Sequence, residues 1–313
     1  MIEVARLRKT YRIAEGGLLR RRHRTIVAVD DVSFDIPRGA MVAFLGPNGA
    51  GKSTTLKVLA GILVPDSGEC RVDGRIPWRE RRVHAARIGV VFGQRTQLWW
   101  DLPVRDSYAL LATLHGLGAA EGRTRRDQLA SQLDLEPLLD VPVRQLSLGQ
   151  RMRCEIGAAL LHGPEVLYLD EPTIGLDADS RHAVRSALRD IQSKLGTTVL
   201  LATHDLHEVE ALCSRILLID HGKLLVDDTL EGLRRTIAPG QWLVARQDAP
   251  IDDPDLEPLA PEGGARAHRI LCAPDAVPGL LARVARALPG LEWTVQSPPL
   301  EAVIRAAREA SRS

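Results

Sequence analysis

The sequence predicts an α/β fold, and three features support this prediction. An apolar run at residues 41–45 is followed by a glycine-rich loop at residues 46–54 and then by a helical pattern. A second apolar run, at residues 166–169, ends in two acidic residues. A third, at residues 198–202, ends before a threonine and a histidine. Short apolar runs of this kind, separated by helical segments, are typical of buried strands in an α/β sheet.

The chain opens with strand patterns. Residues 2–6, residues 26–34 with their β-branched side chains, and residues 42–45 are predicted strands. Between the first two lies a basic run at residues 16–24, which is most simply a solvated loop. The alternative is contact of residues 20–24 with anionic lipid headgroups, each charge adding about 1 kcal/mol at a membrane surface.

The loop at residues 46–54 has the pattern G-x-x-x-x-G-K-S directly after a strand, which makes it a phosphate site rather than an ordinary turn. Its glycines let backbone N–H groups curl around a polyphosphate, and the helix beginning near Lys52 directs its positive end at the same anion. Lys52 is predicted to reach the β- and γ-phosphates, and the Ser53 hydroxyl to hold Mg²⁺. The predicted nucleotide-binding residues of this loop are Gly46, Pro47, Asn48, Gly49, Ala50, Gly51, Lys52, Ser53 and Thr54.

Residues 96–161 change to helical patterns, with leucines at helical spacing. The segment opens with two adjacent tryptophans, Trp99 and Trp100, which cannot both face the core of one element comfortably. At least one is therefore a candidate contact for a partner protein, although core packing of both rings is the alternative. Near the end, Ser147 is predicted to cap the helix over residues 151–161, and its free N–H groups form a second anion-binding helix end.

The strand at residues 166–169 ends in Asp170 and Glu171. Asp170 is suited to hold Mg²⁺, directly or through water, and Glu171 to orient or deprotonate an attacking water. A solvated Asp-Glu turn is the alternative, which the phosphate loop upstream disfavours. Further on, residues 217–226 have a hairpin pattern with His221 and Gly222 at the turn, and residues 230–237 a helical pattern.

Beyond residue 237 the composition changes. Pro239, Gly240 and the Pro/Asp-rich residues 248–261 predict a boundary and a loop. Strands are predicted at residues 242–246, 268–272 and 291–295, a helix at residues 277–288, and a final helix with Ser297 as N-cap and Pro298 at its first position. Residues 237–313 are therefore a predicted small α+β accessory domain, in which no catalytic cluster is evident.

In order and spacing, these motifs resemble those of the ATP-binding subunits of ABC transporters. The resemblance covers residues 1–236. Residues 146–150 resemble the signature motif, residues 170–171 the acidic strand and residues 175–177 the D-loop. Gln94 resembles the Q-loop glutamine, His204 the switch histidine and Tyr11 the aromatic residue that stacks on adenine. One departure is Leu148, where the family usually has glycine.

The resemblance implies a P-loop NTPase of the ABC cassette type: a mostly parallel core sheet, an antiparallel β subdomain and a helical subdomain at about residues 96–161. It implies an ATPase that uses ATP and Mg²⁺. The implied catalytic residues are Glu171, His204 and Gln94, with Ser53, Gln94 and Asp170 at the metal. Two copies would close head to tail, so that ATP on the phosphate loop of one is capped by the signature end of the other; the implied capping residues are Ser147, Gly149, Gln150 and Asp177.

Three of these assignments have plain alternatives. Gln94 is also suited to be a solvent-facing residue at a strand end, His204 a hydrogen-bonded structural histidine, and Tyr11 a packed surface tyrosine. His204 would need only to position the γ-phosphate, without changing its protonation state.

Composition agrees with a cytosolic ATPase. The 313 residues include 41 basic and 40 acidic side chains, so no overall field recruits nucleic acid. The four cysteines form no C-x-x-C pair, which argues against a zinc site or a disulfide framework. No signal-peptide or membrane-spanning run is evident. A separate membrane subunit is therefore expected to provide any transport path, with this chain at the cytoplasmic face of the inner membrane.

Residues 90–103 and 172–177 resemble a bacterial branch of these subunits that pairs with ABC-2-type permeases in drug or viologen-like export. The rival interpretation is a soluble ABC-type ATPase acting on ribosomes or DNA. Between Gly51 and Ser147, however, there are no sustained heptads or cysteine pairs, and each motif occurs once. A nucleotide-binding scaffold without activity is disfavoured because Glu171 and His204 are both present. No residue identifies a transported substrate.

Overall fold

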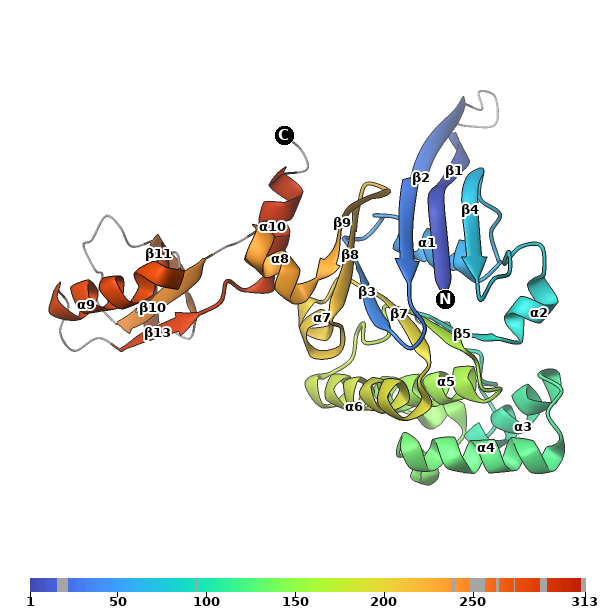
Figure 1. The fold of residues 1–313 in the computed structure, drawn as a ribbon. Coiled ribbons are helices and arrows are strands. Elements are labelled where there is room, and N and C mark those ends of the chain that lie inside the picture. Colours follow the sequence, from blue (N-terminus) through green and yellow to red (C-terminus); the bar gives the residue numbers. More distant parts are fainter. Residues whose placement is uncertain are drawn as a thin grey trace. The chain divides into compact units, whose positions relative to one another are not determined.

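The computed structural model describes residues 1–15, 22–93, 95–237, 240–247, 257–262, 265–272, 274–287 and 292–310 (Figure 1). The chain divides into two compact units, Met1–Asp227 and Asp228–Ser313. This division lies ahead of the predicted boundary between residues 236 and 237. Helix α8 (Leu230–Ile237) contacts α10 (Leu300–Ala310), and this packing places α8 in the second unit.

The first unit contains a six-stranded sheet of order β5-β6-β7-β3-β8-β9. Neighbouring strands from β5 to β8 run parallel, and the hairpin β8–β9 turns through His221 and Gly222, both at positive φ as a tight hairpin requires. The predicted mostly parallel α/β sheet is thus confirmed. Its strands are β3 (Met41–Leu45), β5 (Ile88–Phe92), β6 (Val166–Asp170), β7 (Thr198–Thr203), β8 (Arg215–Asp220) and β9 (Lys223–Thr229).

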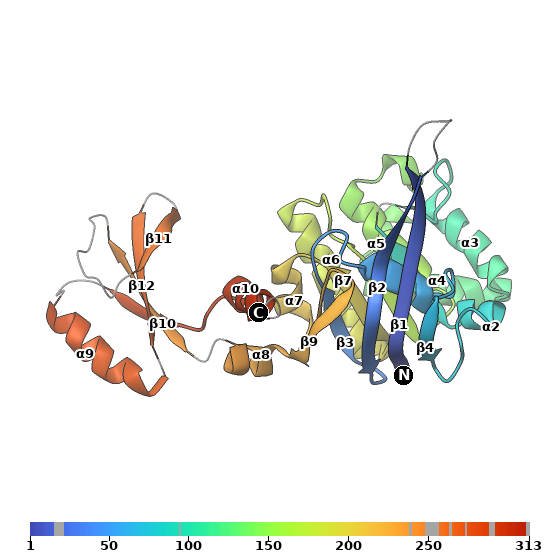
Figure 2. The same ribbon diagram turned by 90° about the horizontal axis from the view of Figure 1, so that it is seen from above.

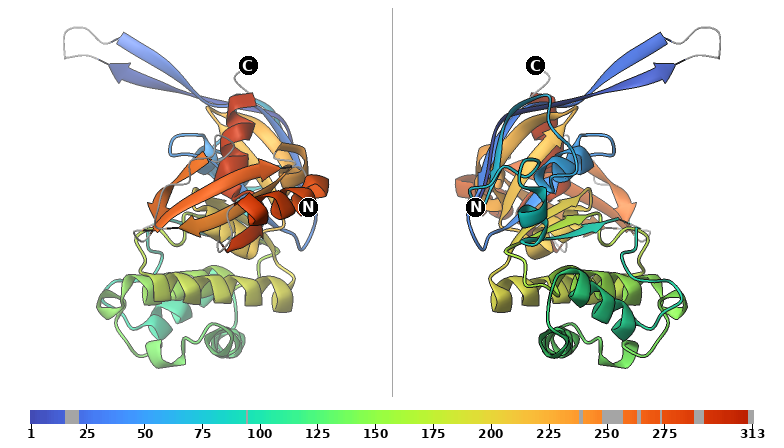
Figure 3. Two further views of the ribbon diagram at one scale, coloured as in Figure 1. Left: turned by 90° about the vertical axis from the view of Figure 1, so that its left-hand side faces the viewer. Right: turned by 90° about the vertical axis from the view of Figure 1, so that its right-hand side faces the viewer.

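A second, antiparallel sheet has the order β2-β1-β4, with β2 at Arg22–Ile36, β1 at Ile2–Glu15 and β4 at Ser67–Val72. The strands β1 and β2 are much longer than predicted and form an extended hairpin (Figure 3). Residues 22–24 of the predicted basic loop belong to β2, because Ile13, Ala14 and Glu15 pair with them across the ladder. Residues 16–21, which include Arg20 and Arg21 of the proposed lipid-contacting residues, lie outside the described residues.

Helix α1 (Lys52–Leu59) lies between the two sheets and contacts β6 on one side and β2 and β4 on the other. Its Leu56, Val58 and Leu59 are fully buried in a core shared by both sheets, where the Phe34 and Phe44 rings meet at 5.9 Å. This burial fixes the helix that follows the phosphate loop against both sheets.

The remaining helices of the first unit include α5, which contacts β5, α3, α4 and α6. The first helix of the helical insert begins at Val104, directly after Pro103, rather than at residue 96; residues 96–103 are irregular, with a turn at Trp100 and Asp101. A proline at this point fits because it lacks the N–H that a helix interior needs. Besides α1, the first unit contains the helices α2 (Arg81–Ala85), α3 (Val104–Leu114), α4 (Ala119–Gln132), α5 (Leu148–Leu160), α6 (Ala178–Asp190) and α7 (Leu206–Leu212).

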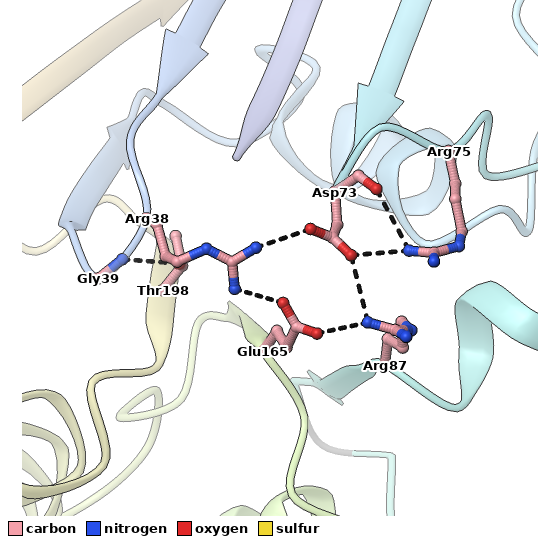
Figure 4. A network of polar contacts seen from close by, with 7 residues as sticks. All are labelled: Arg38, Gly39, Asp73, Arg75, Arg87, Glu165 and Thr198. Carbon is pink, nitrogen blue, oxygen red and sulfur yellow. Dashed lines mark hydrogen bonds and ion pairs between the residues drawn. The ribbon is translucent and has the colours of Figure 1, made fainter.

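A charged network lies at the amino ends of the core strands (Figure 4). Glu165, just before β6, accepts hydrogen bonds from Arg38 and, at 2.5 Å, from Arg87. Asp73, just after β4, accepts from Arg38 at 2.7 Å and from Arg75 at 2.7 Å. The network therefore ties the three-stranded sheet to the six-stranded sheet at the edge opposite the carboxyl ends of β3, β6 and β7.

In the second unit, four strands form a sheet of order β11-β12-β10-β13, and α9 packs against β10 (Figure 2). The predicted loop over residues 248–261 is partly wrong, because residues 257–262 form β11; its Pro258 is tolerated because β11 is an edge strand. The final helix begins at Leu300, so Ser297 is not its cap: the N–H groups of Ala302 and Val303 bond to Pro299 O. The elements are β10 (Gln241–Gln247), β11 (Glu257–Glu262), β12 (Ala265–Cys272), α9 (Val277–Ala287), β13 (Trp293–Gln296) and α10.

All four cysteines lie among the described residues and are free thiols. In that described part of the chain, no helix is both long and apolar enough to span a bilayer.

Candidate nucleotide site

The candidate site lies at the carboxyl edge of the six-stranded sheet, where β3, β6 and β7 end together. Backbone hydrogen bonds join these ends: Glu171 N donates to Ala202 O at 2.8 Å, and Gly46 N donates to Thr203 O at 3.3 Å. The parallel register thus brings the phosphate loop, the acidic pair and the histidine loop to one place, although they are far apart in sequence.

The phosphate loop turns tightly between β8 and β2. Gly51 has φ 108°, and a Cβ there would lie 2.3 Å from Ala28 O, so only glycine fits. Gly49 also has positive φ, 80°, with open space beside it. The loop therefore passes directly into α1, whose first residue is Lys52 and whose N–H groups face the loop.

Lys52 is 5% exposed, and its ammonium lies inside the loop. Its Nζ donates to Gly46 O at 2.6 Å and to Pro47 O at 3.2 Å. The same Nζ lies 3.2 Å from Glu171 Oε1 as an ion pair, without the alignment of a hydrogen bond. A buried cation among carbonyl oxygens attracts a polyphosphate strongly, because little water screens it.

Glu171 also contacts His204: Oε2 lies 2.7 Å from His204 Nδ1. The backbone at Glu171 has φ 55°, a left-handed conformation that costs energy for a residue with a side chain. Lys52, Glu171 and His204 thus form a continuous polar row at the end of the sheet. Of these three, His204 is the exposed member, with 47% of its side chain accessible.

Asp170 lies at the end of β6 and is 9% exposed. Burial raises the pKa of its carboxyl group, while a hydrogen bond from the Ser53 hydroxyl lowers it. Asp170 Oδ1 is buried and has no hydrogen-bond partner in the structure. This buried carboxylate oxygen accepts no hydrogen bond from the described residues and lies beside a serine hydroxyl. Together the two oxygens are ligands that suit a hard cation such as Mg²⁺.

Tyr11 reaches the same region from the long strand β1. Its hydroxyl lies 3.3 Å from Thr54 Oγ1, at the start of α1. The predicted adenine-stacking residue is therefore beside the phosphate loop, a placement that the unpredicted length of β1 makes possible.

The signature end forms a separate group. Ser147 caps α5 as predicted: its Oγ accepts from Gln150 N at 3.2 Å, and Gln150 Oε1 accepts from Ser147 N at 2.9 Å. A Cβ on Gly149 would lie 2.4 Å from Ser180 Cβ. Asp177 accepts from Ser180 N and Ser180 Oγ, both at 2.8 Å, and these bonds lower the pKa of Asp177.

Leu148, the departure from the family pattern, lies against the D-loop. Its Cδ2 is 3.5 Å from where a Cβ on Gly175 would be, an ordinary contact distance. Gly149 and Asp177 both lie against Ser180, and Ser147 caps the helix that carries Gly149, so these residues form one group. Gln94 lies outside the described residues.

Two buried carboxylates near these groups were missed by sequence reasoning. Glu155 on α5 accepts from Thr96 Oγ1 and, at 3.0 Å, from Gln97 N. Glu208 on α7 accepts from Thr173 and Thr203. In the sequence each is one glutamate on an amphipathic helix, and only its burial, 3% and 1% exposed, distinguishes it from a surface residue.

Comparison with known proteins agrees with this geometry. A family model described as "ABC transporter" matches residues 29–174. The Nod factor export ATP-binding protein I of Ralstonia nicotianae is 36% identical over 293 residues, covering 91% of this chain and 90% of that protein. The chain belongs to the ABC transporter family.

Other relatives match the ABC cassette within the chain. The daunorubicin resistance ATP-binding protein DrrA3 of Streptomyces coeruleorubidus is 40% identical over 207 residues, 66% of this chain and 65% of that protein. A solved dimeric ATP-binding cassette in a post-hydrolysis state, bound to ADP and Pi, has a TM-score of 0.63 at 26% identity, covering 74% of this chain and 99% of that one. The predicted ABC cassette and ATPase class are confirmed: this is an ABC-type ATPase subunit.

Proposed function

We propose that this ABC subunit hydrolyses ATP to drive export through separate ABC-2-type permease subunits. The observation that supports this most directly is the row formed by Lys52, Glu171 and His204 at the carboxyl edge of the sheet. Lys52 binds the β- and γ-phosphates, Glu171 orients or deprotonates the attacking water, and His204 positions the γ-phosphate. Gln94 is the proposed further contact for the water and the metal.

Mg²⁺ is held by Asp170, Ser53 and Gln94 in this proposal. When bound, the ion neutralises charge on the β- and γ-phosphates. The partnerless Asp170 Oδ1 supports this assignment, because its burial costs free energy unless a cation or donor compensates it. Ser53 lies beside the same carboxylate, so its hydroxyl and the Asp170 oxygens would be able to hold one cation together.

Two copies of the chain clasp ATP between them. The phosphate loop of one copy binds the triphosphate, and Ser147, Gly149, Gln150 and Asp177 of the other copy cap it. The presence of two helix starts suited to an anion in one chain supports this arrangement, as does the dimeric post-hydrolysis cassette among the similar structures. Loss of the γ-phosphate removes the charged group that both copies bind, so the interface between them weakens.

Export, rather than import, is supported by the names of two relatives, a Nod factor export protein and a daunorubicin resistance protein. The chain would then lie at the cytoplasmic face of the inner membrane, held there by its permease. Trp99 and Trp100 are 39% and 50% exposed, and Arg151 lies over the Trp100 ring at 5.4 Å. An ordered, exposed pair of indole rings is suited to receive a segment of that permease.

The experiment is co-expression with candidate ABC-2-type permease subunits. Trp99→Ala/Trp100→Ala should lose co-purification and transport while the isolated chain still releases phosphate from ATP. Leu110→Ala/Leu114→Ala, which changes two other exposed apolar side chains of the helical region, is the matched control. Intact co-purification and transport in the double tryptophan variant would reject the docking surface, and association with ribosomes or DNA instead of membranes would favour the soluble alternative.

A further inference from the structure

Glu208 is a buried carboxylate in the first turn of α7, the helix that follows His204. Only 1% of it is exposed, and none of the roles proposed above uses it. An ionised carboxylate in such a place is costly unless hydrogen bonds compensate for the lost water. The hydrogen bonds that Glu208 accepts therefore indicate which parts of the site this carboxylate joins.

Both carboxylate oxygens of Glu208 are occupied by threonine hydroxyls. Thr173 Oγ1 donates to Oε1 at 2.5 Å, and Thr203 Oγ1 donates to Oε2 at 2.5 Å. Thr203 Oγ1 in turn accepts from Asp205 N at 3.0 Å, so this hydroxyl both donates and accepts a hydrogen bond. Burial raises the pKa of Glu208, and the two hydroxyl donors oppose this rise.

The two threonines come from different loops of the candidate site. Thr173 follows Glu171 by two residues, in the loop after β6, and Thr203 immediately precedes His204, at the end of β7. The charged groups that also face Glu208 are Asp205 and Arg185, which pair with each other at 3.3 Å. A single side chain thus connects the backbone beside Glu171 to the backbone beside His204.

We propose that Glu208 is the positioning residue that fixes the distance between Glu171 and His204. This inference rests on the proposed function of that pair. Glu171 has a left-handed backbone, which persists only where surrounding contacts hold it. Glu208 supplies such a contact through Thr173, and it does so without touching ATP, water or metal. Without it, each loop keeps its strand, and the two loops stay joined only by the Glu171 N–Ala202 O bond and the Glu171–His204 contact among the contacts described above.

Removal of this link should lower the rate of hydrolysis and leave ATP binding nearly unchanged. Glu208→Ala is expected to reduce kcat about 10- to 100-fold, since a displacement of about 1 Å in a catalytic group has effects of this size. The kcat of Glu208→Gln should lie between those of Glu208→Ala and the wild type. Its amide oxygen can accept from Thr203, and its NH₂ can donate to Thr173 Oγ1. Gln is also the variant to use if Ala fails to fold.

The control is Glu210→Gln, an exposed glutamate on the same helix, which should keep wild-type kcat. For each variant, kcat, ATP affinity and thermal midpoint are measured on the full chain. A fall in kcat with ATP affinity and thermal midpoint near wild type, graded Ala below Gln below Glu, supports positioning. Unchanged kcat in Glu208→Ala, or a fall that only follows loss of folded protein and of ATP binding, overturns it.

Glu171→Gln, measured in parallel, separates this inference from the proposed function. If Glu171→Gln hydrolyses ATP at the wild-type rate, the proposed roles of the pair are wrong. If Glu171→Gln is inactive but Glu208→Ala is as active as the wild type, only the role of Glu208 is wrong.

Discussion

At the scale of single residues, Lys52 has the most constrained environment in the candidate site. Its side chain is almost wholly buried, and two carbonyl oxygens of its own loop fix its ammonium. Lys52→Ala should weaken ATP binding about 10- to 100-fold, because a hydrogen bond to a charged group contributes about 1.5–3 kcal/mol. Equilibrium binding of ATP measures this, with Lys57→Ala on the same helix as control. Undiminished affinity would contradict the assignment of Lys52.

His162 predicts a pH dependence of stability that is separate from catalysis. Burial, together with the neighbouring His115 and Arg125, lowers the pKa of His162 from 6.5 to about 4. The His115 ring stacks on it at 3.9 Å, and Nε2 lies 3.0 Å from Ile88 O, so the folded chain holds the neutral ring. The unfolded chain takes up this proton at higher pH. Stability from the neutral ring is therefore full above pH 6.5 and is lost as pH falls toward about 4.

The measurement is the thermal midpoint between pH 8 and pH 5. His162→Gln should show a shallower fall with acidification than the wild type, whereas His182→Gln, at an exposed position, should follow the wild type. Equal slopes for the wild type and His162→Gln would show that His162 makes no such contribution.

Which residues the sequence could reveal depended on how local their signal is. Lys52 and Ser53 lie in a loop whose pattern is typical of phosphate binding, and Ser147 precedes a helix whose third residue, Gln150, completes its cap. Thr173, which donates to Glu208, and Gln97, which donates to Glu155, come from loops distant in sequence, so these pairings could not be predicted from any local pattern. The same limit explains why the Glu171–His204 contact, between the ends of two strands, became evident only from the parallel register.

At the scale of elements, the sequence predicted the strands of the six-stranded sheet, but it did not predict the full length of the β1–β2 hairpin or the strand β11. Buried parallel strands such as β6 and β7 are continuous apolar runs, whereas the first residues of β2, Arg22, His23 and Arg24, have the basic composition that is typical of loops. Strand β11 was missed because its prolines and acids indicate a loop, and its place at the edge of the sheet is what permits them.

The charged network at the opposite edge of the core sheet gives a prediction about how the two sheets are held together. Glu165 accepts from two arginines that come from different loops. Because these side chains are partly exposed, Glu165→Gln should cost only about 1 kcal/mol, a fall of about 2–4 °C in the thermal midpoint. ATP hydrolysis at a permissive temperature should be unchanged, since the network lies away from the site.

Thermal unfolding with Glu136→Gln, an exposed glutamate of the helical region, as control checks this expectation. A loss of more than about 4 kcal/mol would mean that the network is effectively buried rather than solvent-screened.

At the scale of the whole molecule, the proposed dimer uses two surfaces of each chain, and each surface binds ATP together with the other surface of a second copy. The row of Lys52, Glu171 and His204 binds the triphosphate from one side, and the end of α5 with Ser147 presents a capped helix start to an anion. In this account ATP stabilises the contact between two copies because it completes both surfaces, by the usual linkage of ligand binding to assembly. Hydrolysis then releases the contact, and this cycle would drive the permease.

Closure of two copies on ATP is best tested by the molecular mass of Glu171→Gln in Mg-ATP, measured by light scattering after size exclusion. The account predicts twice the monomer mass with Mg-ATP and the monomer mass without it, and a return to monomer in Glu171→Gln/Ser147→Glu, whose new carboxylate repels the phosphates. A monomer at every ATP concentration, or a dimer that Ser147→Glu leaves intact, would contradict the account.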